Sequence, residues 1–148
     1  MDSINTYFNT YMPSSSVSQL SVNNFRSCGS LTGSNLNSGI TVVFFYIPEC
    51  RNCQDFAPEF SNFSDNYATS IGSRAVAVNM STGSNNSLIG MSSNFSYSLG
   101  KVWPTVIVFH NGNPCSAYNG PRNAKSLASF ISSSSSSGTC NFKFIPCE

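Results

Sequence analysis

Three runs of apolar residues predict the central strands of a β-sheet. Residues 40–47, ITVVFFYI, are apolar apart from one threonine and rich in β-branched and aromatic side chains, which is typical of a strand covered on both faces. Residues 75–80, AVAVNM, and residues 105–110, TVIVFH, predict two further buried strands. The sheet is therefore expected to have an apolar centre.

Two shorter strands are expected at the margins of this sheet. Residues 17–21 predict the first strand of the chain, and residues 115–118 predict the last. Asn111-Gly112 precedes the last strand, and this dipeptide is typical of a tight hairpin turn. The strands on either side of it are therefore expected to be antiparallel neighbours.

Helices are predicted where apolar residues recur every three or four positions. After Cys53, one face of such a helix contains Phe56, Ala57, Phe60, Phe63 and Tyr67. Pro58 lies inside this helix and is expected to kink it, because proline removes one backbone donor. A last helix is predicted at residues 122–131, a short one within residues 22–31 and a weaker one around residues 88–99.

The resulting order of elements, βαβαβαββα, predicts the α/β fold class, with a central mixed sheet flanked by helices on both faces. A chain of 148 residues fits one such domain. We place the domain at residues 17–131, an N-terminal arm at residues 1–16, and a serine-rich C-terminal tail with two cysteines at residues 132–148.

The low charge of the chain argues against some classes of partner. Charged residues make up only 9% of the chain, against about 25% in ordinary soluble domains, and the net charge is +1. Scattered Lys and Arg do not form the basic patch that nucleic acids require, so no nucleic-acid binding is expected. No stretch approaches the length of a membrane span, and residues 1–16 lack the pattern of a signal peptide, so cytoplasmic synthesis is the expectation.

Six cysteines and four Asn-x-Ser/Thr sequons would instead suit a secreted chain. The sequons begin at Asn62, Asn79, Asn85 and Asn94. Because serine and asparagine are abundant in this chain, such sequons also arise by chance, and they leave the compartment open.

The candidate chemistry is a pair of cysteines, Cys50-Arg51-Asn52-Cys53, at the start of a predicted helix. At that position free backbone N–H groups and the helix dipole stabilise negative charge. We therefore expect Cys50 to attack disulfides as the thiolate, and Cys53, one turn inside, to resolve the mixed disulfide. Arg51 adds a positive charge beside the pair, whereas Glu49 opposes it.

Two other roles for the pair stay open at this point. A zinc site needs two more ligands, and neither His110 nor the tail cysteines Cys140 and Cys147 supply a recognisable second half. A static disulfide also fits the fold. The four cysteines outside the pair allow three pairings, and Cys115 bonded to a tail cysteine would fix the tail on the hairpin edge. Cys28 is the best candidate for a buried free thiol.

Residues 17–131 resemble the thioredoxin family. The family's strand, Cys-x-x-Cys motif and following helix are matched by TVVFFYIPECRNCQDFAPEF, including a proline five residues beyond the second cysteine, here Pro58. Its cis-proline strand is matched by WPTVIVFHNG, which places Pro104 opposite the cysteines, and Gly120 matches a glycine after the last strand.

This resemblance implies a thioredoxin-like fold and a thiol-disulfide oxidoreductase that acts on protein thiols and disulfides, with no cofactor and no metal. The first cysteine of the pair would be the nucleophile and the second the resolving thiol. Pro104 would be the cis residue that shapes the substrate groove, and the backbone of Trp103 would pair with an extended peptide. Arg51 and Asn52 would border the same groove.

Three departures from the family pattern concern the surroundings of the pair. Phe44 stands where family members have a buried Asp or Glu, the acceptor for the proton of the resolving thiol, and Ala77 replaces a neighbouring lysine. Glu49 replaces an aromatic residue, and Arg-Asn replaces the usual Gly-Pro or Gly-His. Without the carboxylate, desolvation is expected to raise the pKa of Cys53, so we expect slow turnover or none.

Two functions from different classes are therefore weighed. The first is the oxidoreductase, which the order of the family landmarks favours. The second is a non-catalytic subunit of a large assembly, such as a minor capsid protein in the particle of a large DNA virus, whose tails contact neighbouring subunits. The low charge, the abundance of serine and asparagine and the missing carboxylate favour the second.

Overall fold

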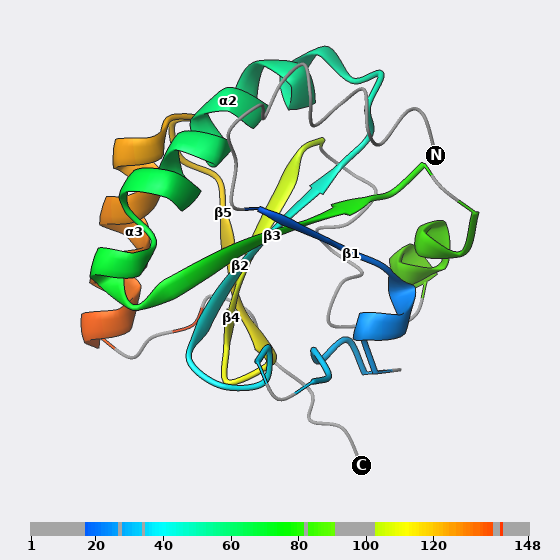
Figure 1. Ribbon diagram of the computed structural model, residues 1–148, viewed down its shortest axis with the longest axis horizontal. Coiled ribbons are helices and arrows are strands. Elements are labelled where there is room, and N and C mark those ends of the chain that lie inside the picture. The colour runs from blue at the N-terminus through cyan, green and yellow to red at the C-terminus, as the bar shows by residue number, and fades with distance from the viewer. Residues whose placement is uncertain are drawn as a thin grey trace.

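Five strands form one mixed sheet in the order β1-β3-β2-β4-β5 (Figure 1). The computed structural model describes residues 17–26, 28–33, 35–81, 83–90, 103–137 and 140. The strands are β1 Ser18–Leu20, β2 Ile40–Tyr46, β3 Ser73–Asn79, β4 Thr105–His110 and β5 Asn113–Tyr118. β3 is parallel to β1 and β2, whereas β4 is antiparallel to β2 and β5. All five predicted strands and the mixed α/β class are confirmed.

A two-residue turn joins β4 to β5. Asn111 and Gly112 both have positive φ, 52° and 85°, as in the turns that match the twist of a hairpin. A Cβ added at Gly112 would lie 3.0 Å from Cα of Asn37, so this position also needs glycine for space. The hairpin predicted from the Asn-Gly dipeptide is confirmed.

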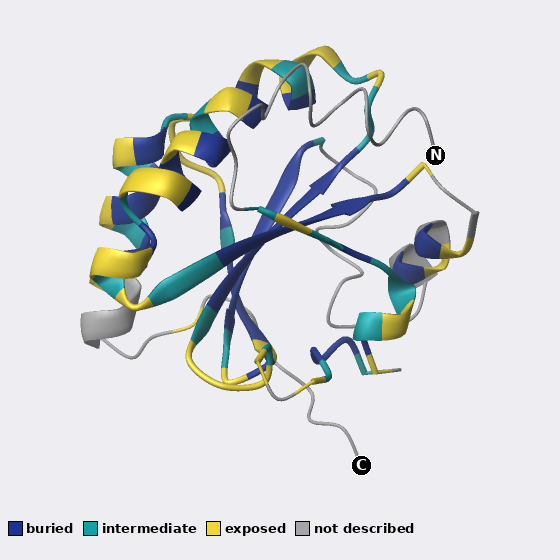
Figure 2. Ribbon diagram, viewed as in Figure 1, coloured by how far each residue is buried: buried dark blue, intermediate teal, exposed yellow. Residues whose placement is uncertain are grey.

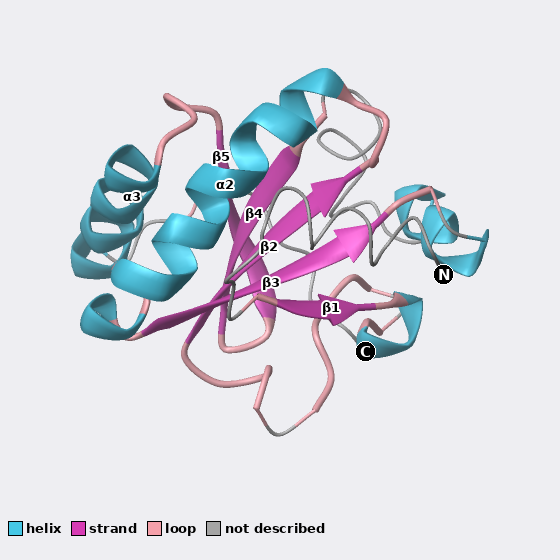
Figure 3. Ribbon diagram, turned by 45° about the horizontal axis from the view of Figure 1, so that its top comes forward, coloured by secondary structure: helices cyan, strands magenta, loops and turns pink. Residues whose placement is uncertain are grey.

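Two α-helices cover one face of the sheet (Figure 3). α2 spans Arg51–Asn66 and continues past Pro58, which lies on its exposed side, and α3 spans Ala124–Ser137. The serines that follow Ile131 were expected in the tail, but they form the end of α3. Serine disfavours a helix by only about 0.5 kcal/mol per residue, and a helix anchored by buried Leu127 and Ile131 propagates into such a segment.

Short 3-10 helices pack against the opposite face in the described part of the chain. They are η1, Val22–Asn24, and η3, Gly83–Gly90; a third, η2, Thr69–Ile71, follows α2. Helices were predicted on both faces, and those on this face are 3-10 segments among the described residues. None of the described helices is long and apolar enough to cross a bilayer.

Two of the weaker helix predictions have different outcomes. The helix expected within residues 22–31 is wrong beyond its first turn, because the chain leaves η1 for an antiparallel bridge between Phe25 and Leu31. The helix expected around residues 88–99 coincides with the end of η3, where Leu88 is buried, and its positions from 91 onward lie outside the described residues.

The central strands are buried on both faces because packed layers lie on either side of them (Figure 2). On the α2 side, the ring of Phe44 stacks on Phe60 with centroids 5.0 Å apart and meets the edge of Phe56 at 5.9 Å. This aromatic layer fixes α2, and with it the cysteine pair, against β2.

Candidate active site

Cys50 lies between the end of β2 and the start of α2. The connecting turn is closed by a hydrogen bond from the N–H of Cys50 to the carbonyl of Ile47, at 3.0 Å. Cys50 is the N-cap residue of α2, and its sulfur accepts a hydrogen bond from the N–H of Cys53 at 3.4 Å. The predicted position of the pair at a helix N-terminus is therefore confirmed.

The two cysteines differ in exposure. Cys50 is half-buried and Cys53 is fully buried, and neither is bonded in a disulfide. The static-disulfide alternative is thus not the state that the structure contains. Among the described residues, no group of three His, Cys, Asp or Glu side chains could hold a metal ion. One reachable thiol above one sheltered thiol is an arrangement suited to disulfide exchange.

The Trp103–Pro104 peptide bond is cis, as the sequence resemblance implied. The thiol of Cys50 donates a hydrogen bond to the carbonyl oxygen of Trp103 at 3.7 Å. Pro104 is buried, whereas Trp103 is half-buried and packs against the core on both faces of the sheet. The structure therefore brings together Cys50, Cys53 and the segment that begins β4, although 53 residues separate Cys50 from Trp103.

A cleft of about 470 Å³ opens beside Pro104. Its walls come from α2, from β4 and the residue before it, and from the end of β5 with the segment that follows: Phe56, Pro104, Val106, Tyr118, Asn119, Gly120 and Arg122. Arg51 and Asn52 do not line it; both are exposed on the first turn of α2. Arg51 forms an ion pair with Asp55 at 3.2 Å, so its charge is paired with a carboxylate one turn further along the same helix.

Burial raises the pKa of Cys53 to about 12, chiefly by desolvation. The neighbouring thiol of Cys50 adds to this shift, while a backbone hydrogen bond from Ile47 and the charge of Arg122 oppose it. Phe44 pairs in register with Ala77 and is fully buried, so the two positions where the sequence resemblance implied charged residues are both apolar. The expected rise in the pKa of Cys53 is confirmed.

Sequence reasoning missed the role of the segment that holds Arg122. Oε1 of Glu59 in α2 accepts a hydrogen bond from the N–H of Ala124, at 2.9 Å, at the start of α3. Tyr118 donates a hydrogen bond to the carbonyl of Pro121 on the other side of Arg122. Glu59 and Ala124 are 65 residues apart in the chain, and no local pattern in the sequence indicates this contact.

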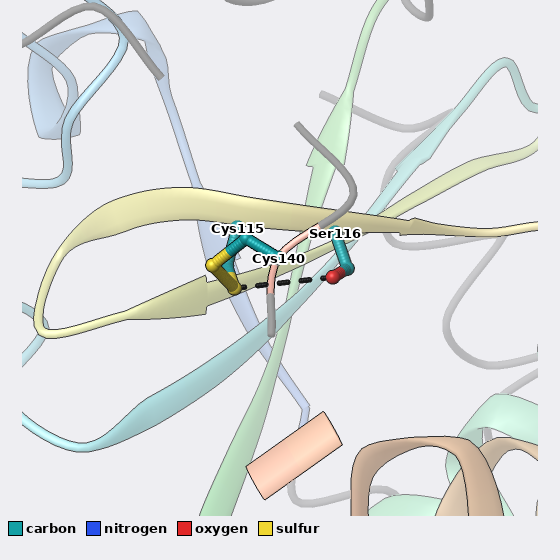
Figure 4. The surroundings of a disulfide bond; sticks show 3 residues. All are labelled: Cys115, Ser116 and Cys140. Atoms are coloured by element: carbon teal, nitrogen blue, oxygen red, sulfur yellow. Dashed lines mark hydrogen bonds between the residues drawn. A yellow bond between two sulfur atoms is a disulfide. The ribbon is translucent and has the colours of Figure 1, made fainter. Parts of the chain in front are cut away.

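The remaining described cysteines form disulfides at the opposite end of the sheet. Cys115 of β5 is bonded to Cys140 of the tail, with their Cα atoms 4.7 Å apart (Figure 4). This bond confirms that a tail cysteine fixes the tail on the hairpin edge and excludes a bond between Cys140 and Cys147. Cys28 is also disulfide-bonded, so its interpretation as a free thiol is wrong.

Comparison with known proteins identifies the family of this chain. The family model described as Thioredoxin matches residues 17–133. The probable protein disulfide-isomerase ER-60 of Schistosoma mansoni is 31% identical over an alignment of 116 positions, which covers 72% of this chain and 22% of that protein. The chain thus spans about a fifth of this curated relative.

Two solved structures share the fold. Human ERp44, form I, superimposes with a TM-score of 0.60 at 24% identity, over 80% of this chain and 29% of that one. The J-Trx1 fragment of ERdj5 superimposes with a TM-score of 0.59 at 23% identity, over 84% of this chain and 52% of that fragment.

Proposed function

The chain belongs to the thioredoxin family, and we propose that it is a thiol-disulfide oxidoreductase that acts on protein disulfides through Cys50 and Cys53. One observation supports this most directly: a reachable sulfur caps α2 while a second, buried thiol lies one turn inside the same helix. Neither cysteine is in a disulfide, and the dithiol is the form of such a pair that reduces a substrate.

In the first step, the thiolate of Cys50 attacks one sulfur of a substrate disulfide. A bond forms between the sulfur of Cys50 and that substrate sulfur, the substrate S–S bond breaks, and the second substrate sulfur leaves as a thiolate. The carbonyl of Trp103 lies beside Cys50 and supplies an acceptor for the backbone of an extended substrate. The cleft beside Pro104 receives substrate side chains that neighbour the disulfide.

In the second step, the thiolate of Cys53 attacks the sulfur of Cys50. The mixed disulfide breaks, the substrate leaves with its second thiolate, and a Cys50–Cys53 disulfide retains the two-electron oxidation. Before this, Cys53 must lose a proton that burial holds on the sulfur, and apolar Phe44 offers no acceptor for it. The second step is therefore the slow one, and the mixed disulfide accumulates.

Reduction of insulin by dithiothreitol tests the proposal. We expect the wild-type chain to accelerate the reaction and Cys50→Ser to abolish the acceleration. Cys53→Ser is the matched variant, and it should still form the mixed disulfide but not release it. Equal rates for the wild type and Cys50→Ser would contradict an oxidoreductase.

The second candidate is the non-catalytic subunit of a large assembly, such as a minor capsid protein. The apolar Phe44–Ala77 pair beneath the cysteines favours it, because a chain without turnover needs no proton acceptor there. This candidate predicts that Cys50→Ser leaves the insulin rate unchanged, so the same assay separates the two.

A further inference from the structure

The sequons differ sharply in where the fold places them. Asn62 lies on the exposed side of α2, whereas Asn79 and Asn85 are buried. Asn94 lies outside the described residues. We propose that Asn62 is an N-glycosylation site, and that the chain folds with an N-linked oligosaccharide there but not with one at Asn79 or Asn85. This goes beyond the proposed redox function and does not rest on it.

Asn79 and Asn85 are excluded by their contacts. The side-chain oxygen of Asn79 accepts hydrogen bonds from the N–H and the hydroxyl of Ser81, at 2.9 and 2.7 Å. Nδ2 of Asn85 donates to the carbonyl of Asn79 at 3.1 Å, and its Oδ1 accepts from the N–H of Val22 at 2.8 Å. A sugar on either amide would have to enter the packed interior between β3 and η1, which has no room for it.

Asn62 has the opposite surroundings. Its Oδ1 accepts a hydrogen bond from Nδ2 of Asn66 at 2.5 Å, one turn further along α2. Its own Nδ2, the atom to which a sugar is attached, has no hydrogen-bond partner in the described part of the chain. Asn62 shares the solvent-facing side of α2 with Asp55 and Pro58, so a glycan there projects away from the sheet.

The chemistry requires a lipid-linked oligosaccharide pyrophosphate as co-reactant. Nδ2 of Asn62 attacks the anomeric carbon of the sugar, an N-glycosidic bond forms, the bond from that carbon to the pyrophosphate oxygen breaks, and the lipid pyrophosphate leaves. The amide gives up one proton to a base of the transferase. The hydroxyl of Ser64 completes the sequon; Ser64 is buried in the folded helix, so transfer precedes folding.

Two further features agree with this assignment. The Cys115–Cys140 disulfide and the bonded state of Cys28 are typical of chains that fold in an oxidising compartment, where this modification occurs. Asn62 is also twelve residues from Cys50, roughly 18 Å along the helix axis, so a glycan there leaves the cysteine pair accessible.

The test is cell-free translation of the full chain behind a cleavable secretory leader, with microsomes present and Asn94→Gln as the background. Because transfer precedes folding, the folded chains are first isolated by their resistance to limited proteolysis. We expect this resistant fraction to show one endoglycosidase-sensitive gel shift. Asn62→Gln and Ser64→Ala should each abolish it. Ser61→Ala should keep it, because Ser61 is a buried serine of the same helix outside the sequon.

A glycan in the protease-resistant fraction of Asn62→Gln, or no glycan in the resistant fraction of the background chain, would overturn the proposal. A glycosylated chain that is degraded as readily as a reduced, unfolded one would also overturn it, because the fold would then not tolerate the sugar.

Discussion

Phe44 lies beneath the cysteine pair and is expected to limit its chemistry. It packs against Phe56 and Phe60 beneath α2, where the sequence resemblance implied a proton acceptor. We predict that Phe44→Glu speeds release from the mixed disulfide by at least about tenfold, because it supplies a base within the buried layer.

The same substitution should lower the free energy of unfolding by about 3 kcal/mol or more, since a carboxyl group replaces stacked rings. Quenched-flow measurement of the mixed disulfide and urea denaturation give the two readouts. Phe44→Leu is the control, because it disturbs the packing without adding a carboxylate. If it speeds release as much as Phe44→Glu does, proton transfer is not the limiting event.

The raised pKa of Cys53 predicts how the second step depends on pH. Below a pKa of about 12, the thiolate fraction rises about tenfold for each pH unit. Resolution of a preformed mixed disulfide should therefore quicken by about that factor per unit between pH 7 and pH 9, as followed by release of a fluorescent substrate. A rate that levels off below pH 9 would show that the proton leaves more readily than burial predicts.

The raised pKa of Cys53 should also make the free energy of unfolding depend on pH. The pKa of Cys53 is higher in the folded chain than its ordinary value of 9.0, so the folded state retains this proton more tightly than the unfolded state. The resulting stabilisation is present below pH 9 and is lost as pH rises toward 12. Urea denaturation at pH 8 and pH 10 should show a larger loss for the wild type than for Cys53→Ala. Equal losses would assign alkaline unfolding to buried tyrosines such as Tyr46, whose pKa burial also raises.

At the scale of elements, a hydrogen bond from the start of α3 to a carboxylate of α2 links the two helices. Glu59 accepts a hydrogen bond from the N–H of Ala124 and so caps α3 from a different helix. We predict that Glu59→Ala lowers the free energy of unfolding by about 1 kcal/mol, as loss of a cap does. Glu59→Gln retains an acceptor oxygen and should lose less than half of that in the same denaturation assay. An Ala variant as stable as the wild type would mean that water replaces the cap.

The elements that could be predicted from the sequence are those whose pattern of apolar residues directly reflects which of their faces are buried. β2 and β4 have continuous apolar runs because both faces are covered, and α2 shows its buried face every three or four residues. The end of α3 was missed because serine neither favours nor forbids a helix, and packing of Ile131 decides the outcome. The cysteine pair and its apolar floor at Phe44 were visible in the sequence. Arg122 near Cys53 was not, because Glu59 places it through a tertiary contact.

For the molecule as a whole, the Cys115–Cys140 bond ties the tail to the edge of the sheet. It closes a segment of 25 residues that includes all of α3. We predict that Cys115→Ser/Cys140→Ser lowers the free energy of unfolding by about 3 kcal/mol, the usual scale for a loop of this length. Cys50→Ser/Cys53→Ser is the matched control and should change stability much less, as read by thermal denaturation. Similar losses from the two double variants would contradict a structural role confined to the first pair.

Cys50 and Cys53 follow the end of β2, whereas Cys115 lies beside the hairpin turn at the opposite end of the sheet. Cys115 is almost entirely shielded from solvent, and its partner Cys140 is exposed. The proposed redox chemistry at the helix cap is therefore spatially separate from the disulfide that holds the tail. Under the proposed function, electrons enter and leave at one end of the sheet while a different bond at the other end keeps α3 in place.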